Sequence, residues 1–171
     1  MHYGVTVIVI VLLVSLLSFR ALGALGISRF ATWPAAAAHA LAVMLMMTGS
    51  AHFMPSSVTV MPNYDDLVAM VPSFVPFPGF MVLFTGVLEL LAAVGLILTR
   101  TRRIAGWALV PLFVLLLPAN IYAAVENVTF AGEPASPLWQ RIPEQLLYIG
   151  FAIWATGSLT PATRDRVPAQ R

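Results

Sequence analysis

Glu89 occupies the position that most strongly suggests chemistry, because it lies near the middle of an apolar stretch long enough to cross a membrane. A charged side chain at the centre of a bilayer costs roughly 2.5–3.5 kcal/mol on insertion scales, so such residues usually face a bundle interior and serve a function. Gly86 precedes it by one turn, where a small residue permits close helix packing or leaves room for a ligand. Glu89 is therefore either a protonated or paired carboxyl that holds helices together, or part of a functional site.

Two further polar residues lie in or at the end of other apolar stretches. His52 is expected near a membrane boundary, where it is solvated, paired with Glu89 or in contact with a ligand. Asn120 follows Pro118, which removes a backbone donor and frees the carbonyl of Val114. The Asn120 amide could satisfy a freed backbone group or form a hydrogen-bonding wall of a pocket.

The last apolar stretch opens with four residues of interest, Arg141, Pro143, Glu144 and Gln145. Pro143 fits a first helical turn, and Glu144 suits the positive end of a helix dipole. Arg141 is expected to pair with Glu144 or with a lipid phosphate. Gln145 is expected to face the bundle, where it makes an interhelical hydrogen bond or contacts a ligand.

These polar residues suggest one polar cavity in the outer half of a membrane bundle. Four different spans contribute to it, and the candidate ligand-binding residues are His52, Gly86, Glu89, Asn120, Arg141 and Gln145. No catalytic or metal-binding residue is assigned. The chain has no cysteine, which removes thiolate catalysis, disulfides and iron–sulfur ligation. It shows no nucleotide-binding loop, nucleophile elbow or metal-ligand spacing.

The elements that position these residues are membrane helices. The 171 residues are 60% hydrophobic and only 9% charged, far from the roughly one quarter of charged residues in soluble proteins. A span needs about 20 mostly apolar residues. Five stretches approach this length and predict an all-α polytopic bundle: 3–22, 35–54, 77–98, 104–125 and 142–159. The first stretch resembles a signal peptide in position, but it lacks a basic n-region, so a retained anchor is favoured.

The arginines predict the orientation, because basic residues near span ends stay in the cytoplasm. Eight of the nine fall on one side, and Arg141 is the exception. The sequence therefore predicts an outer N-terminus and a cytoplasmic C-terminus. It also predicts three regions: an N-terminal anchor with its loop (1–34), a four-helix membrane domain (35–160) and a cytoplasmic tail (161–171). Arg100, Arg102 and Arg103 are interpreted as a topology anchor that also attracts anionic lipid.

The first outer loop is predicted to hold a short interfacial helix within 62–72. Asn63 can cap this helix, Asp65 and Asp66 suit its positive end, and Pro72 stops it. Pro76 and Pro78 are expected to keep the chain extended until the third span begins.

The same residues resemble the DoxX-like family of small bacterial membrane proteins. The matching segments together cover about residues 40–157: Ala51-His52-Phe53, Met70-Val71-Pro72, Thr85-Gly86 with Glu89, Pro118-Ala119-Asn120, and Arg141-Ile142-Pro143 with Gln145. The resemblance implies a four-helix core, so the first span is an addition. It also implies an association with membrane redox systems, including a thiosulfate:quinone oxidoreductase and complexes that handle oxidative stress.

The leading functional hypothesis is a non-catalytic subunit or accessory factor of a redox or envelope complex in the bacterial plasma membrane. The cofactor is unknown, and a quinone-like or lipid-like molecule is the expected pocket ligand. Expected partners are membrane lipids and other membrane or envelope proteins, without nucleic acid; alanines in span two permit an oligomer. The alternatives are a quinone-reactive oxidoreductase subunit with a proton relay through Glu89 and His52, and a small transporter.

Overall fold

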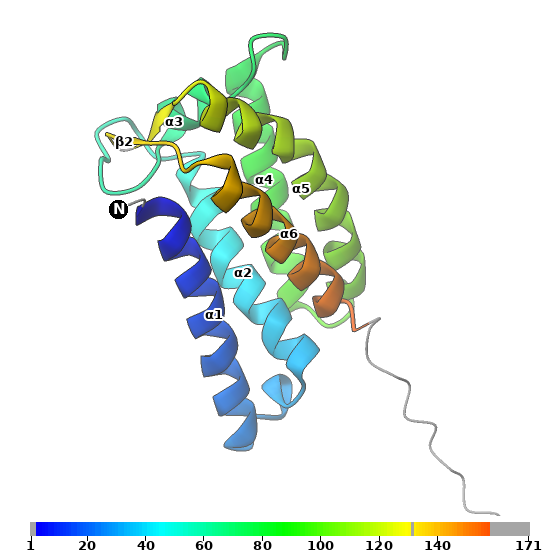
Figure 1. The fold of residues 1–171 in the computed structure, drawn as a ribbon. Helices are drawn as coiled ribbons and strands as arrows, with labels where there is room; N and C mark the ends of the chain where they lie inside the picture. The colour runs from blue at the N-terminus through cyan, green and yellow to red at the C-terminus, as the bar shows by residue number, and fades with distance from the viewer. Residues whose placement is uncertain (1–2, 131, 158–171) are drawn as a thin grey trace, which may run out of the picture.

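The computed structural model describes residues 3–130 and 132–157, which form a bundle of long helices (Figure 1). In chain order the elements are α1 (Tyr3–Ala24), the 3₁₀ helix η1 (Ser28–Phe30), α2 (Trp33–Ala51), α3 (Tyr64–Ala69), α4 (Pro78–Ile97), α5 (Arg102–Val125), β1 (Thr129–Phe130), β2 (Glu133–Pro134) and α6 (Leu138–Ala155). The long helices alternate in direction. The predicted all-α membrane bundle is confirmed.

Four helices in the described part of the chain are long and apolar enough to cross a membrane: α1 from Thr6 onward, α2, α4 and α5. The protein is therefore a membrane protein. The fifth predicted span, α6, lies alongside these helices (Figure 1) but does not share their apolar character, because its first half carries Arg141, Glu144 and Gln145.

The central helix of the bundle is α2, which contacts α1, α4 and α6. Its first half is almost entirely buried, and the buried residues include a set of alanines: Ala35, Ala36, Ala37, Ala38, Ala40 and Ala42. Side chains this small let neighbouring helix backbones approach closely, which is how membrane helices gain packing energy. The sequence of α2 therefore explains why three helices can surround it.

The N-terminal helix α1 packs on one side of α2 and exposes most of its remaining surface. Leu12 and Leu16 are its buried contacts. Near its end, the guanidinium of Arg20 lies 5.4 Å from the centre of the Trp33 ring, a cation–π contact with the start of α2. Phe19 also contacts the ring of His39, with 5.5 Å between the ring centres. These contacts attach α1 to the bundle.

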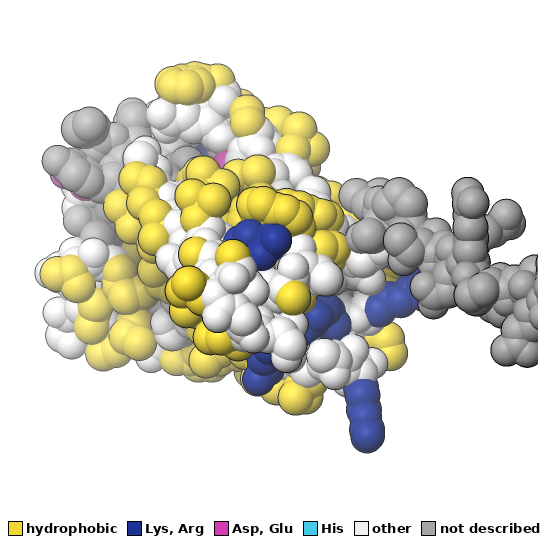
Figure 2. Space-filling view, turned by 90° about the horizontal axis from the view of Figure 1, so that it is seen from below, with side chains coloured by type: hydrophobic (Ala, Val, Ile, Leu, Met, Phe, Trp, Pro, Cys, Tyr) yellow, Lys and Arg dark blue, Asp and Glu magenta, His cyan; other side chains and the backbone are white. Residues whose placement is uncertain are grey.

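The two ends of the bundle differ in charge. The α3 end carries α3 and the short β1–β2 hairpin, in which Phe130 pairs with Glu133. Asn63 caps α3 and forms a capping box with Asp66, so the predicted short helix and its cap are confirmed. The opposite end carries η1 and the loop between α4 and α5, and Figure 2 views this end directly. Several arginine side chains gather there, so we call it the arginine-rich end.

Two local predictions are wrong. The last helix begins at Leu138, not Ile142, so Pro143 lies inside it and Pro137 precedes it. Pro137 has extended backbone angles and directs the chain into the helix. The helix continues through Pro143 although this residue has no backbone N–H to donate. The segment before α4 is not extended throughout, because Phe77 has a left-handed φ of 53°. The predicted end of the last span at 159 and the tail at 161–171 lie outside the described residues.

Candidate functional site

Glu89 lies near the middle of α4 and is buried, with 5% of its surface exposed. Glycines bring α4 against α2 at this point. A Cβ atom on Gly49 would lie 3.0 Å from Leu90 Cδ2 and 3.3 Å from Glu89 Cβ. A Cβ atom on Gly86 would lie only 2.5 Å from His52 Cβ. Gly86 therefore permits close packing, and the space beside it is filled by His52.

Two side chains of α2 contact the Glu89 carboxylate. The Thr48 hydroxyl donates a hydrogen bond to Oε2 at 2.8 Å, and His52 Nε2 lies 3.7 Å from Oε1. Thr48 and His52 are four residues apart and so share one face of the chain as it leaves α2. The predicted pairing of His52 with Glu89 is present, and His52 is buried rather than solvated.

The hydrogen bonds of His52 determine which of its nitrogens carries a proton. Nδ1 lies 2.7 Å from the carbonyl oxygen of Val82, and a carbonyl oxygen only accepts hydrogen bonds. Nδ1 must therefore be the donor, which leaves Nε2 facing Glu89. At 3.7 Å, Nε2 and Oε1 are in contact but too far apart for a direct hydrogen bond. His52 is thus fixed by Val82 and presents Nε2 to the Glu89 carboxyl group.

A second polar group links α5 and α6. Arg141 Nη1 donates to Asn120 Oδ1 at 2.6 Å, and Arg141 Nε donates to the carbonyl of Ser136 at 3.0 Å. The Asn120 amide donates to the carbonyl of Leu116 at 3.2 Å. Asn120 therefore does satisfy a backbone carbonyl, but on its own turn and not that of Val114. Arg141 is held by protein groups on both sides.

The inward face of α6 brings this second group toward the first. Arg141, Gln145 and Tyr148 are spaced four and three residues apart, so they lie on one helix face. The Tyr148 hydroxyl donates a hydrogen bond to Glu144 Oε1, and Tyr148 also interacts electrostatically with Glu89. Gln145 lies between Arg141 and Tyr148 on this face. Its Oε1 atom is buried and has no hydrogen-bond partner among the described residues.

We call this set of side chains the interhelical polar network: Thr48, His52, Glu89, Asn120, Arg141, Glu144, Gln145 and Tyr148. Of the residues predicted from the sequence, His52, Gly86 and Glu89 meet between α2 and α4, and Asn120 and Arg141 meet between α5 and α6. Gln145 lies on the α6 face between Arg141 and Tyr148. Because Tyr148 interacts with Glu89, the two groups face a common region.

Sequence reasoning missed Thr48, Gly49 and Tyr148. Helical spacing could have indicated the first and last, because Thr48 precedes His52 by four residues and Tyr148 follows Glu144 by four. Gly49 could not be found in this way, because its contact with α4 depends on how the two helices cross. The network combines a carboxyl group beside an imidazole, amide and guanidinium donors, and an unpaired acceptor on Gln145.

Comparisons with known proteins give a family and no activity. No curated protein matches the chain, and no solved structure matches it. Residues 41–156 match a family described as a domain of unknown function (DUF8561). The matched range begins within α2, after α1, and contains every residue of the interhelical polar network. The chain therefore belongs to the DUF8561 family.

Proposed function

We propose that this protein is a membrane subunit or accessory factor without catalytic activity of its own. In this proposal its interhelical polar network binds the polar head of a quinone-like or lipid-like molecule. One observation carries the proposal: the buried, unpaired oxygen of Gln145, placed between Arg141 and Tyr148 on the inward face of α6. A buried acceptor without a donor costs about 1–3 kcal/mol. A bound hydroxyl or amide group would remove that cost.

The rest of the network supplies complementary groups for such a head. Glu89 and His52 lie side by side, and a carboxyl group and an imidazole can each donate a hydrogen bond to a ligand oxygen or accept one from a ligand hydroxyl, depending on protonation. Lipid-facing leucines and phenylalanines surround the bundle, and exposed examples on α4 are Phe80, Phe84 and Leu91. An apolar tail would therefore find a matching environment at the bundle surface.

The proposal includes a location and an orientation. We place the protein in a bacterial plasma membrane, with the α3 end outside and the arginine-rich end in the cytoplasm. The support is the distribution of charge: Arg20, Arg29 and Arg100 lie toward one end, whereas Asp65 of α3 and Glu133 of β2 lie at the other. Basic residues near span ends resist translocation. The association with a redox or envelope complex rests on the resemblance to DoxX-like proteins.

The proposal is tested by purifying the full-length protein in mild detergent and identifying co-purified proteins and extracted lipids by mass spectrometry. We expect a quinone or a defined lipid in near-stoichiometric amount, together with a membrane or envelope partner. Gln145→Leu should lower the bound amount about tenfold, since a lost buried hydrogen bond is worth about 1–3 kcal/mol. Gln140 also has a buried, unpaired Oε1 but lies outside the helix face of Arg141, Gln145 and Tyr148, so Gln140→Leu is the comparison and should have little effect.

A monodisperse wild-type protein with neither a partner nor a bound molecule would overturn the proposal. Equal loss of ligand from Gln145→Leu and Gln140→Leu would also count against it, because the effect would then not belong to the inward face of α6.

The buried contact between His52 and Glu89 favours a second candidate, a quinone-reactive oxidoreductase subunit. Reduction of a quinone takes up two electrons and two protons. A redox partner would supply the electrons, and Glu89 and His52 would relay the protons. Glu89→Gln should then slow quinone reduction by reduced sulfur compounds in isolated membranes, whereas Thr48→Val keeps the carboxyl and should retain most of the rate. An unchanged rate in Glu89→Gln would remove this candidate.

A further inference from the structure

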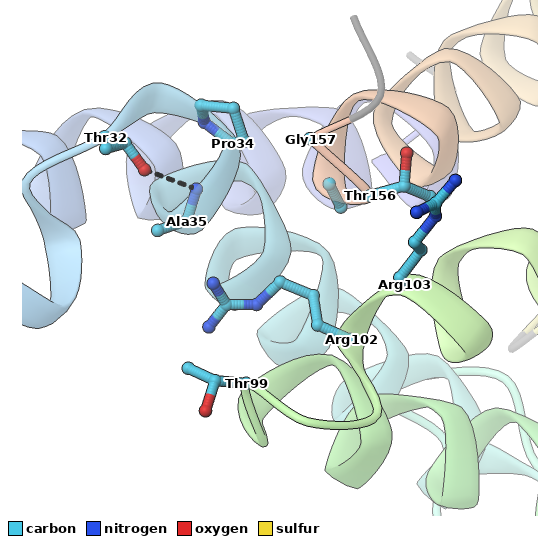
Figure 3. Close-up of a pocket in the computed structure, with 9 residues that line it drawn as sticks. Thr32, Pro34, Ala35, Thr99, Arg102, Arg103, Thr156 and Gly157 are labelled. Carbon is cyan, nitrogen blue, oxygen red and sulfur yellow. Dashed lines mark hydrogen bonds between the residues drawn. The ribbon is translucent and has the colours of Figure 1, made fainter. Parts of the chain in front are cut away.

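A cavity of about 400 Å³ opens at the arginine-rich end, far along the bundle from α3 (Figure 3). Three segments form it: the start of α2, the α4–α5 loop with the start of α5, and the end of α6. We call it the arginine cavity, and its lining residues are Thr32, Pro34, Ala35, Thr99, Arg102, Arg103, Ala155, Thr156 and Gly157. Its volume is within the range of small-molecule sites, roughly 300–1,000 Å³.

Arg102 lines the cavity and is fixed on one side, while one nitrogen of its guanidinium stays unpaired. Its Nε donates to the carbonyl of Leu96 at 3.0 Å, which fixes the side chain against the end of α4. Its Nη2 is buried and has no hydrogen-bond partner among the described residues. Figure 3 shows the guanidinium extending between Thr99 and the start of α2. A guanidinium carries five N–H donors in a planar fork that matches phosphate oxygens.

The surroundings of Arg102 are positive without any acidic partner in the cavity. Arg103 also lines the cavity, Arg29 is near enough to repel the charge of Arg102, and none of the lining residues is acidic. Like charges in one place are unfavourable unless an anion offsets them. The helices α2 and α5 begin here, but α6 ends here and α4 ends beside the cavity, so the helix dipoles offset one another and the positive field comes from the arginines.

Hydroxyl groups complete the set of donors. Thr32 Oγ1 accepts a hydrogen bond from the backbone N–H of Ala35 at 3.3 Å, which leaves its own hydrogen free to donate. Thr99 lies on the other side of Arg102 (Figure 3). An anion placed beside Arg102 would thus be near cationic and neutral donors from two different segments.

We propose that the arginine cavity binds a phosphate group. The arrangement fits an anion with several oxygen atoms better than a single carboxylate, because the donors come from opposite walls. At the expected depth of the inner headgroups, the phosphate could belong to an anionic phospholipid or to a free phosphate in the cytoplasm. This site is separate from the interhelical polar network and does not depend on the function proposed for that network.

The test uses the full-length protein in nanodiscs and measures the thermal unfolding midpoint, because a ligand that binds only the folded state raises it. One arm titrates inorganic phosphate against phosphatidylcholine discs at constant ionic strength. The other arm replaces part of the phosphatidylcholine with phosphatidylglycerol. The variants are Arg102→Gln and Arg103→Gln, and the matched control is Arg100→Gln, which removes the same charge from the same loop outside the cavity lining.

We expect at least one probe to raise the wild-type midpoint. Arg102→Gln and Arg103→Gln should each weaken the apparent affinity about tenfold, since a hydrogen bond to a charged group is worth about 1.5–3 kcal/mol, and Arg100→Gln should change it less than about twofold. A response to inorganic phosphate identifies a free phosphate, and a response to phosphatidylglycerol alone identifies a lipid headgroup. No response to either probe overturns the proposal, as does an equal loss in Arg100→Gln. Arg103 is exposed, so its variant decides the matter if Arg102→Gln does not fold.

Discussion

The two polar regions of this protein both bond to side chains and to backbone carbonyls, but they differ in which elements those bonds join. In the interhelical polar network, side chains bond to side chains across helices, as Thr48 does with Glu89 and Arg141 with Asn120. At the arginine-rich end, Arg29 and Arg102 bond to backbone carbonyls at the end of α4, through Ile97 and Leu96. The first region retains an unpaired acceptor on Gln145, and the second retains an unpaired donor on Arg102.

This difference distinguishes the polar groups that stabilise the fold from those that can still bind another group. A buried side-chain pair stabilises the bundle because breaking it leaves an unsatisfied partner inside. An arginine at a helix end can bond to one carbonyl and still present the rest of its guanidinium to another group. We therefore expect substitutions in the interhelical polar network to change stability most and substitutions in the arginine cavity to change it least.

The largest effect is expected for Gly86→Leu. The new Cβ alone would approach His52 Cβ to 2.5 Å, so α2 and α4 would have to separate and the Glu89–His52 pair would be lost. Overpacking of this kind costs about 3 kcal/mol, and the thermal unfolding midpoint in detergent should fall clearly. Gly150→Leu is the matched control, because nothing lies within 4 Å of a Cβ atom on Gly150. Similar midpoints for the two variants would contradict the role of Gly86 as a packing site.

Removal of Arg141 is expected to have the next largest effect. Arg141→Leu leaves the Asn120 oxygen and the Ser136 carbonyl without a donor, at a cost of about 2–3 kcal/mol in the free energy of unfolding. A double-mutant cycle with Asn120→Leu isolates the contact between the two side chains and should give a coupling of about 1.5 kcal/mol or more. A coupling near zero would show that Arg141 and Asn120 stabilise the bundle independently.

A smaller effect is expected for Thr48→Val. The substitution keeps the shape of the side chain and removes one hydrogen bond to Glu89, so the free energy of unfolding should fall by about 1 kcal/mol. Thr59→Val, in an exposed loop position, is the comparison and should change it little. If Glu89→Gln is introduced first, the cost of Thr48→Val should shrink, because the hydroxyl then bonds to a neutral amide.

The smallest effect is expected for Arg103→Gln in phosphate-free detergent. Arg103 is exposed and lines the arginine cavity, so its loss should change the free energy of unfolding by less than about 0.5 kcal/mol. Thermal unfolding without phosphate provides the measurement. A large loss of stability would erase the distinction between the two regions, because Arg103 would then hold the fold as Arg141 is expected to.

Much of the fold could be predicted from local sequence. Apolar length placed α1, α2, α4 and α5 within a few residues, and Asn63 with Asp66 placed α3. The start of α6 could not be predicted as well, because Pro143 was taken as a first-turn residue when the helix begins at Leu138. Proline is compatible with both positions, and only the packing of the preceding turn decides between them.

The candidate site was predicted in part. Because a charged carboxyl is costly inside a membrane, the sequence already indicates that the Glu89 side chain needs a polar partner. In the folded protein His52 lies beside it. The division of the site into an α2–α4 half and an α5–α6 half was not visible, because it depends on which helices are neighbours. The arginine cavity itself was not predicted, although Arg102 and Arg103 are expected from the sequence to attract anionic lipid. Thr32, Arg102 and Thr156 are distant in sequence. In the sequence alone, Thr32 is explained as a helix cap, Arg102 as a topology signal and Thr156 as a residue at a helix end.

The alanine-rich α2 has a consequence for how the protein enters the membrane during synthesis. Its mean hydropathy is 1.3, against 2.5 for α1 and 2.3 for α4, so lipid alone attracts it least among the four spans. The helix at the centre of the finished bundle, α2, is thus the one that partitions least readily from water into the lipid bilayer by itself. We expect α1 to enter first and to retain α2 at the insertion machinery until α4 arrives, so that the order of synthesis becomes part of the folding mechanism.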